Sequence, residues 1–121
     1  MDVADRIFGM GYALQLEPLA FRMAEALADD YDGSYWDFYT LSNGGFYMAP
    51  TALPRYTVRC DNGFAGSVEA DAMGIIVMMY AYSALSFGTG KLAQVCANQY
   101  HLQRDYALDH HDVSTIMAAI D

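Results

Sequence analysis

The chain has 121 residues, of which 55% are hydrophobic and 17% are charged, and this composition suits a folded domain and excludes a disordered chain. Its 15 acidic and 6 basic residues give a formal net charge of −9. Because a protein that follows a nucleic-acid backbone needs clustered lysine and arginine, we expect no direct binding of DNA or RNA. The length predicts a single domain over residues 1–121.

The acidic residues are concentrated near the start of the chain. Six of the nine net negative charges lie in residues 1–39. Such a region repels nucleic acid, and it either attracts a basic partner or keeps a small hydrophobic protein soluble. Both interpretations stay open at this point.

The sequence has no signal for export or membrane insertion. Its first residues are acidic, whereas a secretory signal begins with a basic segment, and no charge-free run reaches the ~20 residues of a membrane span. The two cysteines, Cys60 and Cys96, are too few for a disulfide framework and lack zinc-site spacing. We therefore expect a cytoplasmic protein with buried thiols, without a membrane partner.

The first predicted element is an amphipathic helix over residues 16–31. Its apolar residues recur at steps of three and four, as Leu16, Ala20 and Ala24 illustrate. Pro18 is compatible with this helix because it falls in the first turn.

A first hairpin is predicted from residues 35–41 and 46–49. The intervening Asn43-Gly44 pair favours a type I′ turn, which would place Tyr39 opposite Met48. Both faces of this hairpin are then largely apolar. We expect one face in the core and the other partly covered or open to a partner.

A second hairpin is predicted from residues 56–60 and 64–68. A three-residue loop with Gly63 in the left-handed region pairs Cys60 with Phe64 and Val58 with Gly66. This register gathers the apolar side chains on one face.

The rest of the chain is predicted to be helical. Residues 70–87 are apolar nearly all round, as in a central buried helix, and residues 91–108 and 113–120 have helical spacing. The predicted fold class is α+β: a small antiparallel sheet of about four strands, formed by two hairpins, packs with an N-terminal helix and two to three C-terminal helices.

The histidines do not form an obvious catalytic or metal-binding pattern. His110 and His111 are adjacent, so on a helix they would point about 100° apart. Cys96 and His101 would lie roughly 140° apart around a helix axis, which argues against a local dyad. His101 and Asp105 share a helical face at a spacing typical of a surface ion pair. We expect no catalytic residue and no bound metal.

No cofactor is predicted either. The glycine-containing segments at residues 9–11 and 88–91 lack the full phosphate-binding loop pattern. Helix caps and turns explain these glycines.

Aromatic residues are dense in residues 31–47 and lie among the acidic residues Asp29, Asp30, Asp32 and Asp37. Tyrosine and tryptophan offer a large rigid contact area, which favours interfaces, and the same residues also build small cores. Both roles remain open.

Part of this aromatic region resembles a family signature. Residues 31–50 read YDGSYWDFYTLSNGGFYMAP, which is similar to the signature of the ArdB/KlcA antirestriction family. Further stretches agree at residues 70–72, 80–83, 85–87, 99–101, 106–110 and 118–120. The resemblance extends from Phe8 to the end of the chain.

The resemblance implies a small accessory protein of plasmids, phages and integrated elements that protects incoming DNA from host type I restriction. It also implies a compact α+β fold and no established catalytic residues. The short lead before Phe8 and the presence of Ser34 where relatives have glycine are departures. They leave open an inhibitor of another defence complex, such as a type I CRISPR surveillance complex.

We therefore expect a non-catalytic inhibitor whose contact surface lies in the acidic and aromatic region before Pro50. The candidate contact residues are Asp29, Asp30, Asp32, Tyr35 and Asp37. The expected partner is the DNA-binding subunit of a defence complex in the bacterial cytoplasm, either a restriction enzyme or a CRISPR surveillance complex, and the expected state is a monomer or small homo-oligomer.

Imitation of a long DNA duplex is excluded by charge alone. A duplex segment of ~35 Å, about the diameter of this domain, carries roughly 20 phosphates, more than all of the carboxylates in the chain. Only local mimicry of a few phosphates is physically reasonable. Two other classes compete: an enzyme that modifies a host factor through Cys96, His101 or His110, and a structural accessory protein.

Overall fold

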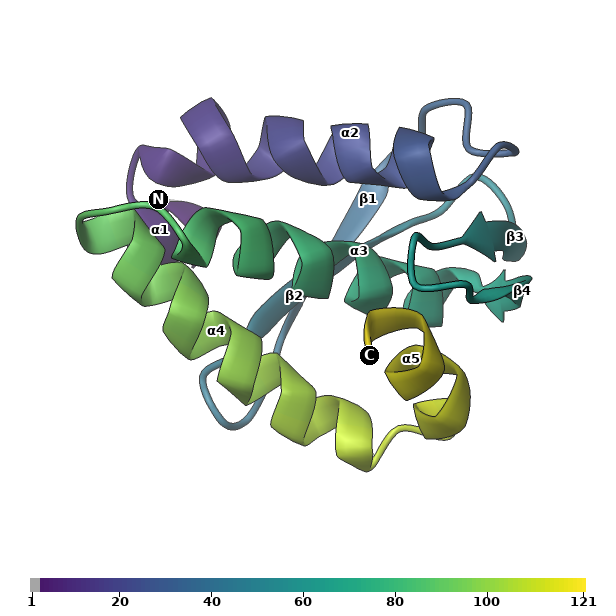
Figure 1. Cartoon of the computed structure of the whole chain (residues 1–121). Helices are drawn as coiled ribbons and strands as arrows, with labels where there is room; N and C mark the ends of the chain where they lie inside the picture. Colours follow the sequence, from purple (N-terminus) through teal and green to yellow (C-terminus); the bar gives the residue numbers. More distant parts are fainter. Residues whose placement is uncertain (1–2) are drawn as a thin grey trace.

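A computed structural model describes residues 3–121 and confirms the α+β fold class (Figure 1). Before the strands come three helical segments, α1, the π-helix η1 and α2. Two hairpins, β1–β2 and β3–β4, lead into three C-terminal helices. The bounds are α1 Val3–Phe8, η1 Tyr12–Leu16, α2 Glu17–Leu27, β1 Trp36–Thr40, β2 Phe46–Pro50, β3 Arg55–Arg59, β4 Ala65–Glu69, α3 Ala70–Ser86, α4 Lys91–Leu108 and α5 Val113–Ile120.

The central element is α3, as its sequence predicts. Ten of its 17 residues are buried. In Figure 1 it runs through the middle of the molecule between α2 and α4, with β1–β2 behind it and β3–β4 and α5 near its first residues. Among the residues described, no helix combines the length and the hydrophobicity that a membrane span needs.

The N-terminal helix differs from its prediction at both ends. It begins earlier, with the π-helix η1, and α2 ends at Leu27 rather than at Tyr31. It ends there because Ala28 takes an extended conformation and forms an antiparallel bridge with Val58 of β3. The next turn is held by Asp30, whose two carboxylate oxygens accept the backbone N–H of Thr57 at 3.0 and 3.2 Å.

The buried residues of η1 and α2 follow a four-residue step. Tyr12, Leu16, Ala20 and Ala24 are all buried. Small side chains at the last two positions allow α2 to approach α3 closely, because alanine projects little beyond the backbone.

The β3–β4 hairpin has the predicted register. Val58 pairs with Gly66 and Tyr56 with Val68, and the loop glycine, Gly63, has φ of +96°. Burial alternates along β3, so one face packs inward and the other meets solvent. Alternation of this kind fixes a register, because a shift by one residue would expose the apolar face.

The β1–β2 hairpin does not have the predicted register. Tyr39 pairs with Tyr47 rather than with Met48, a shift of one residue. The loop has three residues instead of two, and Gly44 takes the left-handed conformation with φ of +92°. Aromatic residues on both faces of β1 leave no alternation that would choose between these registers.

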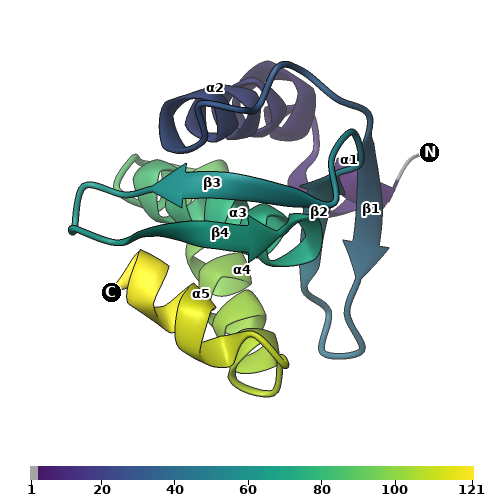
Figure 2. The same ribbon diagram turned by 90° about the vertical axis from the view of Figure 1, so that its right-hand side faces the viewer.

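The two hairpins remain separate two-stranded sheets (Figure 2). The turn of each is fixed to a different helix by an asparagine. Asn43 Nδ2 donates to the carbonyl oxygen of Leu102 in α4 at 2.8 Å. Asn62 Nδ2 donates to the carbonyl oxygens of Ala118 and Ala119 in α5 at 3.0 and 3.1 Å.

Strand β2 packs directly on α3, and all five of its residues are buried. The contact depends on Gly74 of α3. A Cβ atom there would lie 2.5 Å from the Cβ of Ala49 and would also clash with the carbonyl oxygen of Met48. Glycine is required at this crossing because any side chain would separate the helix from the strand.

Candidate functional site

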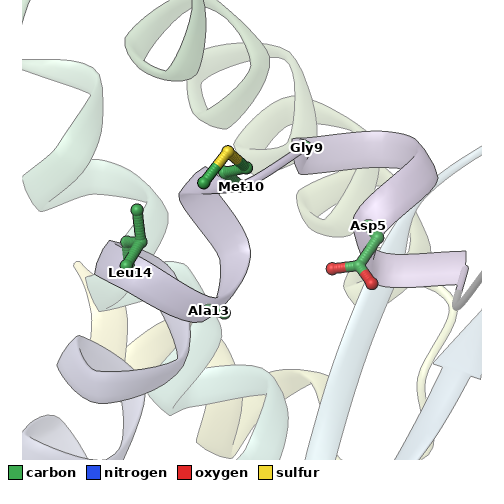
Figure 3. A pocket seen from close by; sticks show the side chains of 5 residues that line it. All are labelled: Asp5, Gly9, Met10, Ala13 and Leu14. Carbon is green, nitrogen blue, oxygen red and sulfur yellow. The ribbon is translucent and has the colours of Figure 1, made fainter.

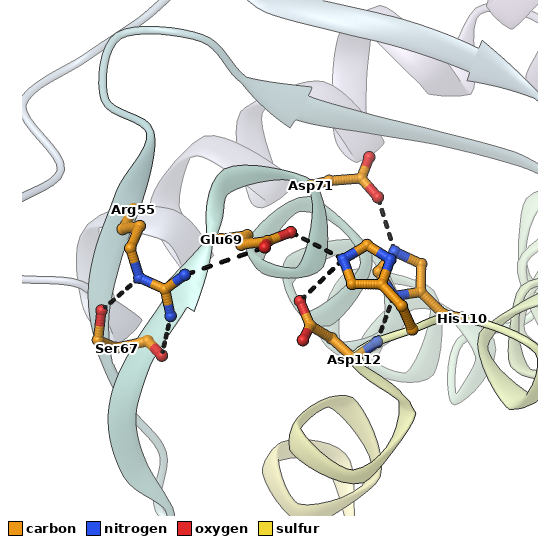
Figure 4. A network of polar contacts seen from close by, with 7 residues as sticks. Arg55, Ser67, Glu69, Asp71, His110 and Asp112 are labelled. Atoms are coloured by element: carbon orange, nitrogen blue, oxygen red, sulfur yellow. Dashed lines mark hydrogen bonds and ion pairs between the residues drawn. The ribbon is translucent and has the colours of Figure 1, made fainter.

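A polar network joins β2, the first turn of α3 and the connection between α4 and α5. The Tyr47 hydroxyl donates to Asp71 Oδ1 at 2.6 Å. On the other side of the carboxylate, His110 Nε2 lies 2.8 Å from Asp71 Oδ2 (Figure 4). The His110 side chain is only 4% exposed. Three residues distant in sequence therefore meet at one carboxylate.

The hydrogen bonds of His110 define its tautomer. The backbone N–H of Asp112 donates to His110 Nδ1 at 2.9 Å, so this nitrogen carries a lone pair and the ring proton resides on Nε2. The Nε2–H group then donates to Asp71. Because both ring nitrogens are engaged, His110 in this arrangement has no free lone pair with which to accept a substrate proton or bind a metal.

Aromatic rings extend the network toward the surface. The ring of Tyr47 stacks on that of Tyr39 with centroids 4.8 Å apart, and Tyr106 contacts both Tyr47 and His110 with centroids 5.8 and 6.1 Å away. Burial raises the pKa of Tyr47 strongly, and the hydrogen bond to the Asp71 carboxylate raises it further. Tyr47 therefore stays protonated and acts as a hydrogen-bond donor.

A second, exposed set of charges lies beside this network. His111 Nε2 lies 2.9 Å from Glu69 Oε2, and Glu69 also faces Arg55 at 4.0 Å. The hydrogen bond with Glu69 raises the pKa of His111, and the same bond lowers the pKa of Glu69. These contacts connect the β3–β4 hairpin to the segment before α5.

The angle of about 100° that His110 and His111 would have on a helix does not apply, because neither residue is helical. Both residues lie between α4 and α5, and their rings stack with centroids 4.3 Å apart and an interplanar angle of 24°. Ligand atoms of His110, His111 and Asp112 come within 4.8 Å of one another. The ring lone pairs of stacked histidines lie in nearly parallel planes and do not converge on one point, so this arrangement does not fit a tetrahedral metal site.

The five predicted contact residues all lie on the surface, but their side chains are not equally available to a partner. Asp29, Asp32, Tyr35 and Asp37 are exposed, and the exposed fraction of Tyr35 is 89%. Asp30 is also exposed, but its carboxylate is committed to the backbone of β3. The set follows the connection from α2 to β1 and the first residues of that strand.

The other candidate catalytic residues do not form a reactive pair. Both cysteines are free and buried, as predicted. Burial raises the pKa of Cys96 to about 11, which keeps it as an unreactive thiol at neutral pH. His101 is exposed on α4, where its ring contacts that of Tyr100.

Two open hollows on the surface are lined mainly by apolar groups. One, of about 400 Å³, lies over α1 and η1 and is lined by Asp5, Gly9, Met10, Ala13 and Leu14 (Figure 3). The other, of about 380 Å³, lies between α2 and β1 and is lined by Glu17, Phe21, Ser34, Tyr35, Trp36 and Phe38. Neither contains a nucleophile beside a base.

The family assignment follows from comparison with known proteins. The chain matches the family model described as "Antirestriction protein" over residues 29–121. It is 36% identical to an antirestriction protein KlcA of Escherichia coli over an alignment that covers 100% of this chain and 87% of that protein. The chain belongs to the antirestriction protein family.

Further relatives agree with this assignment. A second KlcA from E. coli is 40% identical, with 89% of this chain and 76% of that protein covered. A solved structure has a TM-score of 0.88, 34% identity, and coverage of 98% of this chain and 85% of the other. It belongs to work on the KlcA and ArdB proteins, described as showing a novel fold and antirestriction activity against type I DNA restriction systems in vivo but not in vitro.

Sequence reasoning missed the network of Tyr47, Asp71 and His110. Periodicity places these residues on separate elements and carries no information about which side chains meet. A signal was nevertheless present, because all three lie in stretches that resemble the family: residues 31–50, 70–72 and 106–110. The family motifs thus converge on one structural feature.

Proposed function

We propose that this protein counteracts type I DNA restriction by binding a DNA-handling component of the restriction system without chemical catalysis. The observation that carries the proposal is the match to a KlcA and ArdB structure over 98% of the chain at 34% identity. Those proteins are described as active in vivo but not in vitro. The decisive assay for this chain is therefore protection of DNA inside restricting cells.

The arrangement of the titratable side chains supports a binding role. His110 is held by two hydrogen bonds, and Cys96 is buried with a raised pKa. A general base needs a free lone pair, and a cysteine nucleophile needs access and a thiolate. The exposed residues, in contrast, are well suited to contact a protein.

We assign the contact surface to Asp29, Asp32, Tyr35 and Asp37, with Asp30 supporting the backbone behind it. The carboxylates of this surface contribute to the net charge of the chain, which is −9. Negative charge attracts the positively charged DNA-binding channel of a defence complex and accelerates association at low salt. Asp30 contributes negative charge as well, but its bonds to Thr57 make it part of the scaffold.

Two charge-reversing double variants test this surface: Asp29→Lys with Asp32→Lys, and Asp32→Lys with Asp37→Lys. The matched control is Asp105→Lys with Asp109→Lys, which makes the same charge change at exposed positions of α4 and its C-terminus. We expect several-fold weaker protection of unmodified phage DNA for the test variants and unchanged protection for the control.

Circular dichroism verifies that each variant is folded. Full protection by both folded test variants would remove this surface from the proposal. Repeating the assay in cells that carry a type I CRISPR surveillance complex in place of the restriction system identifies the target. Protection only in those cells would replace restriction with CRISPR interference as the function.

A further inference from the structure

The groove between α2 and β1 has an unusual lining for a solvent-exposed site. Four of the six residues that line it are aromatic, and Glu17 is the one charged group among them. Its volume of about 380 Å³ is within the range of small-ligand sites. Two of the aromatic residues are well exposed, Tyr35 at 89% and Phe38 at 42%.

Three of the four aromatic rings of the groove, those of Phe21, Trp36 and Phe38, pack against other rings. Phe21 packs against Trp36 with ring centroids 5.6 Å apart. Phe38 meets Tyr12 and Phe46 edge to face, with centroids 6.0 and 5.7 Å away. Rings fixed in this way present their surfaces without an ordering cost when a partner arrives.

The single carboxylate is also held in place. The Tyr12 hydroxyl donates to Glu17 Oε2 at 2.8 Å. A carboxylate has about four acceptor positions, so Glu17 retains capacity for a further donor. No lysine or arginine lines the groove, and the exposed Asp32 and Asp37 lie in the same part of the chain.

We propose that this groove binds an arginine side chain of the protein partner. The guanidinium group stacks on the aromatic rings, and its N–H groups donate to the Glu17 carboxylate. Arginine fits better than lysine because its planar cation stacks on rings and forms forked hydrogen bonds, whereas the ammonium group of lysine is more strongly hydrated. The inference rests on the proposed function, since it names the chemistry by which the partner is recognised.

The experiment uses tryptophan fluorescence, because Trp36 lines the groove and is the single tryptophan of the chain. The full-length protein is titrated with a tetra-arginine peptide, a tetralysine peptide and an uncharged tetracitrulline peptide. We expect a saturable change with tetra-arginine, about tenfold weaker binding of tetralysine, and no response to tetracitrulline.

Two variants locate the binding site. Glu17→Gln keeps an oxygen for the Tyr12 hydroxyl and removes the charge, so we expect about tenfold weaker binding of tetra-arginine. Glu25→Gln is the matched control, because Glu25 is exposed on α2 and does not line the groove. Phe38→Leu keeps an apolar side chain and removes a ring, and should also weaken binding.

Several outcomes would overturn the proposal. Equal affinities for tetra-arginine and tetralysine would indicate general charge attraction, and equal effects of Glu17→Gln and Glu25→Gln would place the peptide elsewhere. Concentration-dependent self-association that blocks the peptide would assign the groove to a second copy of the chain. Peptide binding without any loss of cellular protection by Glu17→Gln would leave the arginine site in place and separate it from the proposed function.

Discussion

The two hairpins are built alike and packed differently. Each has five-residue strands, a three-residue loop that ends in a left-handed glycine, and an asparagine that binds a helix carbonyl. In β1–β2 the second strand is entirely buried against α3, whereas in the other hairpin β3 alternates between buried and exposed positions and β4 buries only Val68. The loop glycine and asparagine therefore account for the formation of each hairpin, whereas the packing of its strands on the helices determines how deeply they are buried.

The largest expected difference between the hairpins concerns two glycines, Gly74 of α3, on which β2 packs, and Gly66 within β4. Gly74→Ala would force β2 away from α3, so we expect a loss of about 3 kcal/mol in the free energy of unfolding. Gly66→Ala in β4 is the matched substitution, because its new Cβ would meet only the Phe64 ring at 3.4 Å. We expect a change within about 0.5 kcal/mol there.

Urea denaturation followed by circular dichroism measures both values. Similar stabilities for the two variants would show that the contact of β2 with α3 adjusts easily, and would contradict the difference drawn between the hairpins.

The next effect concerns the polar groups that attach each hairpin to the helices. Asp71→Ala removes the acceptor of both Tyr47 and His110, two buried side chains, so we expect a loss of about 2 kcal/mol. Glu69→Ala removes the exposed counterpart beside β3–β4 and should cost less, because water replaces its partners. A larger loss for Glu69→Ala in chemical denaturation would reverse this ranking.

A smaller loss of stability, similar for the two hairpins, is expected when either turn asparagine is replaced. Asn43→Ala and Asn62→Ala each remove a side-chain bond to a helix carbonyl, for an expected loss of about 1 kcal/mol. Each asparagine also accepts a backbone N–H within its own turn, from Gly45 and Phe64 respectively.

Amide hydrogen exchange locates the two asparagine effects. The Gly45 amide should exchange faster in Asn43→Ala, and the Phe64 amide should do so in Asn62→Ala. Faster exchange at both turns in either variant would show that the hairpins are coupled rather than independent.

The smallest effect is a pH dependence confined to β3–β4. The pKa of His111 is raised above its ordinary value of 6.5 and that of Glu69 is lowered, each chiefly through their mutual hydrogen bond. The ionic attraction between His111 and Glu69 is therefore lost as the pH rises through the raised pKa of His111, because the imidazole loses its proton. It is also lost as the pH falls through the lowered pKa of Glu69, because the carboxylate gains one.

Titration of His111 by NMR tests this pair. In Glu69→Gln the pKa of His111 should fall toward 6.5, because its main hydrogen-bonding carboxylate is gone. An unchanged pKa would assign the shift to Asp112, whose carboxylate lies 3.4 Å away.

Helix bounds and hairpin registers were predictable from the sequence where nearby residues alone determine them. The bounds of α4 and α5 are confirmed, because the helical spacing of their apolar residues specifies them and Gly90 directly precedes α4. The register of β3–β4 is also confirmed, because Gly63 and the apolar alternation specify it. The register predicted for β1–β2 was wrong, because aromatic residues occupy both faces of β1 and no apolar alternation distinguishes one register from the other. The meeting of Tyr47, Asp71 and His110 was not predictable from pattern, since it depends on how three elements pack.

The π-helix η1 has a consequence for the angular phase of the N-terminal helix. In an α-helix, a step of four residues overshoots one turn by about 40°, so residues buried at every fourth position would gradually wind around the axis. The wider π turn makes the same step fall short of a full turn. From Tyr12 to Leu16 the phase therefore moves backward, which offsets the advance through Ala20 and Ala24. Deleting one residue between positions 13 and 15 would give a regular α-helix in which the four buried residues recur at steps of three, four and four and still share one face. The π turn therefore takes up one additional residue without moving Tyr12 off the buried face.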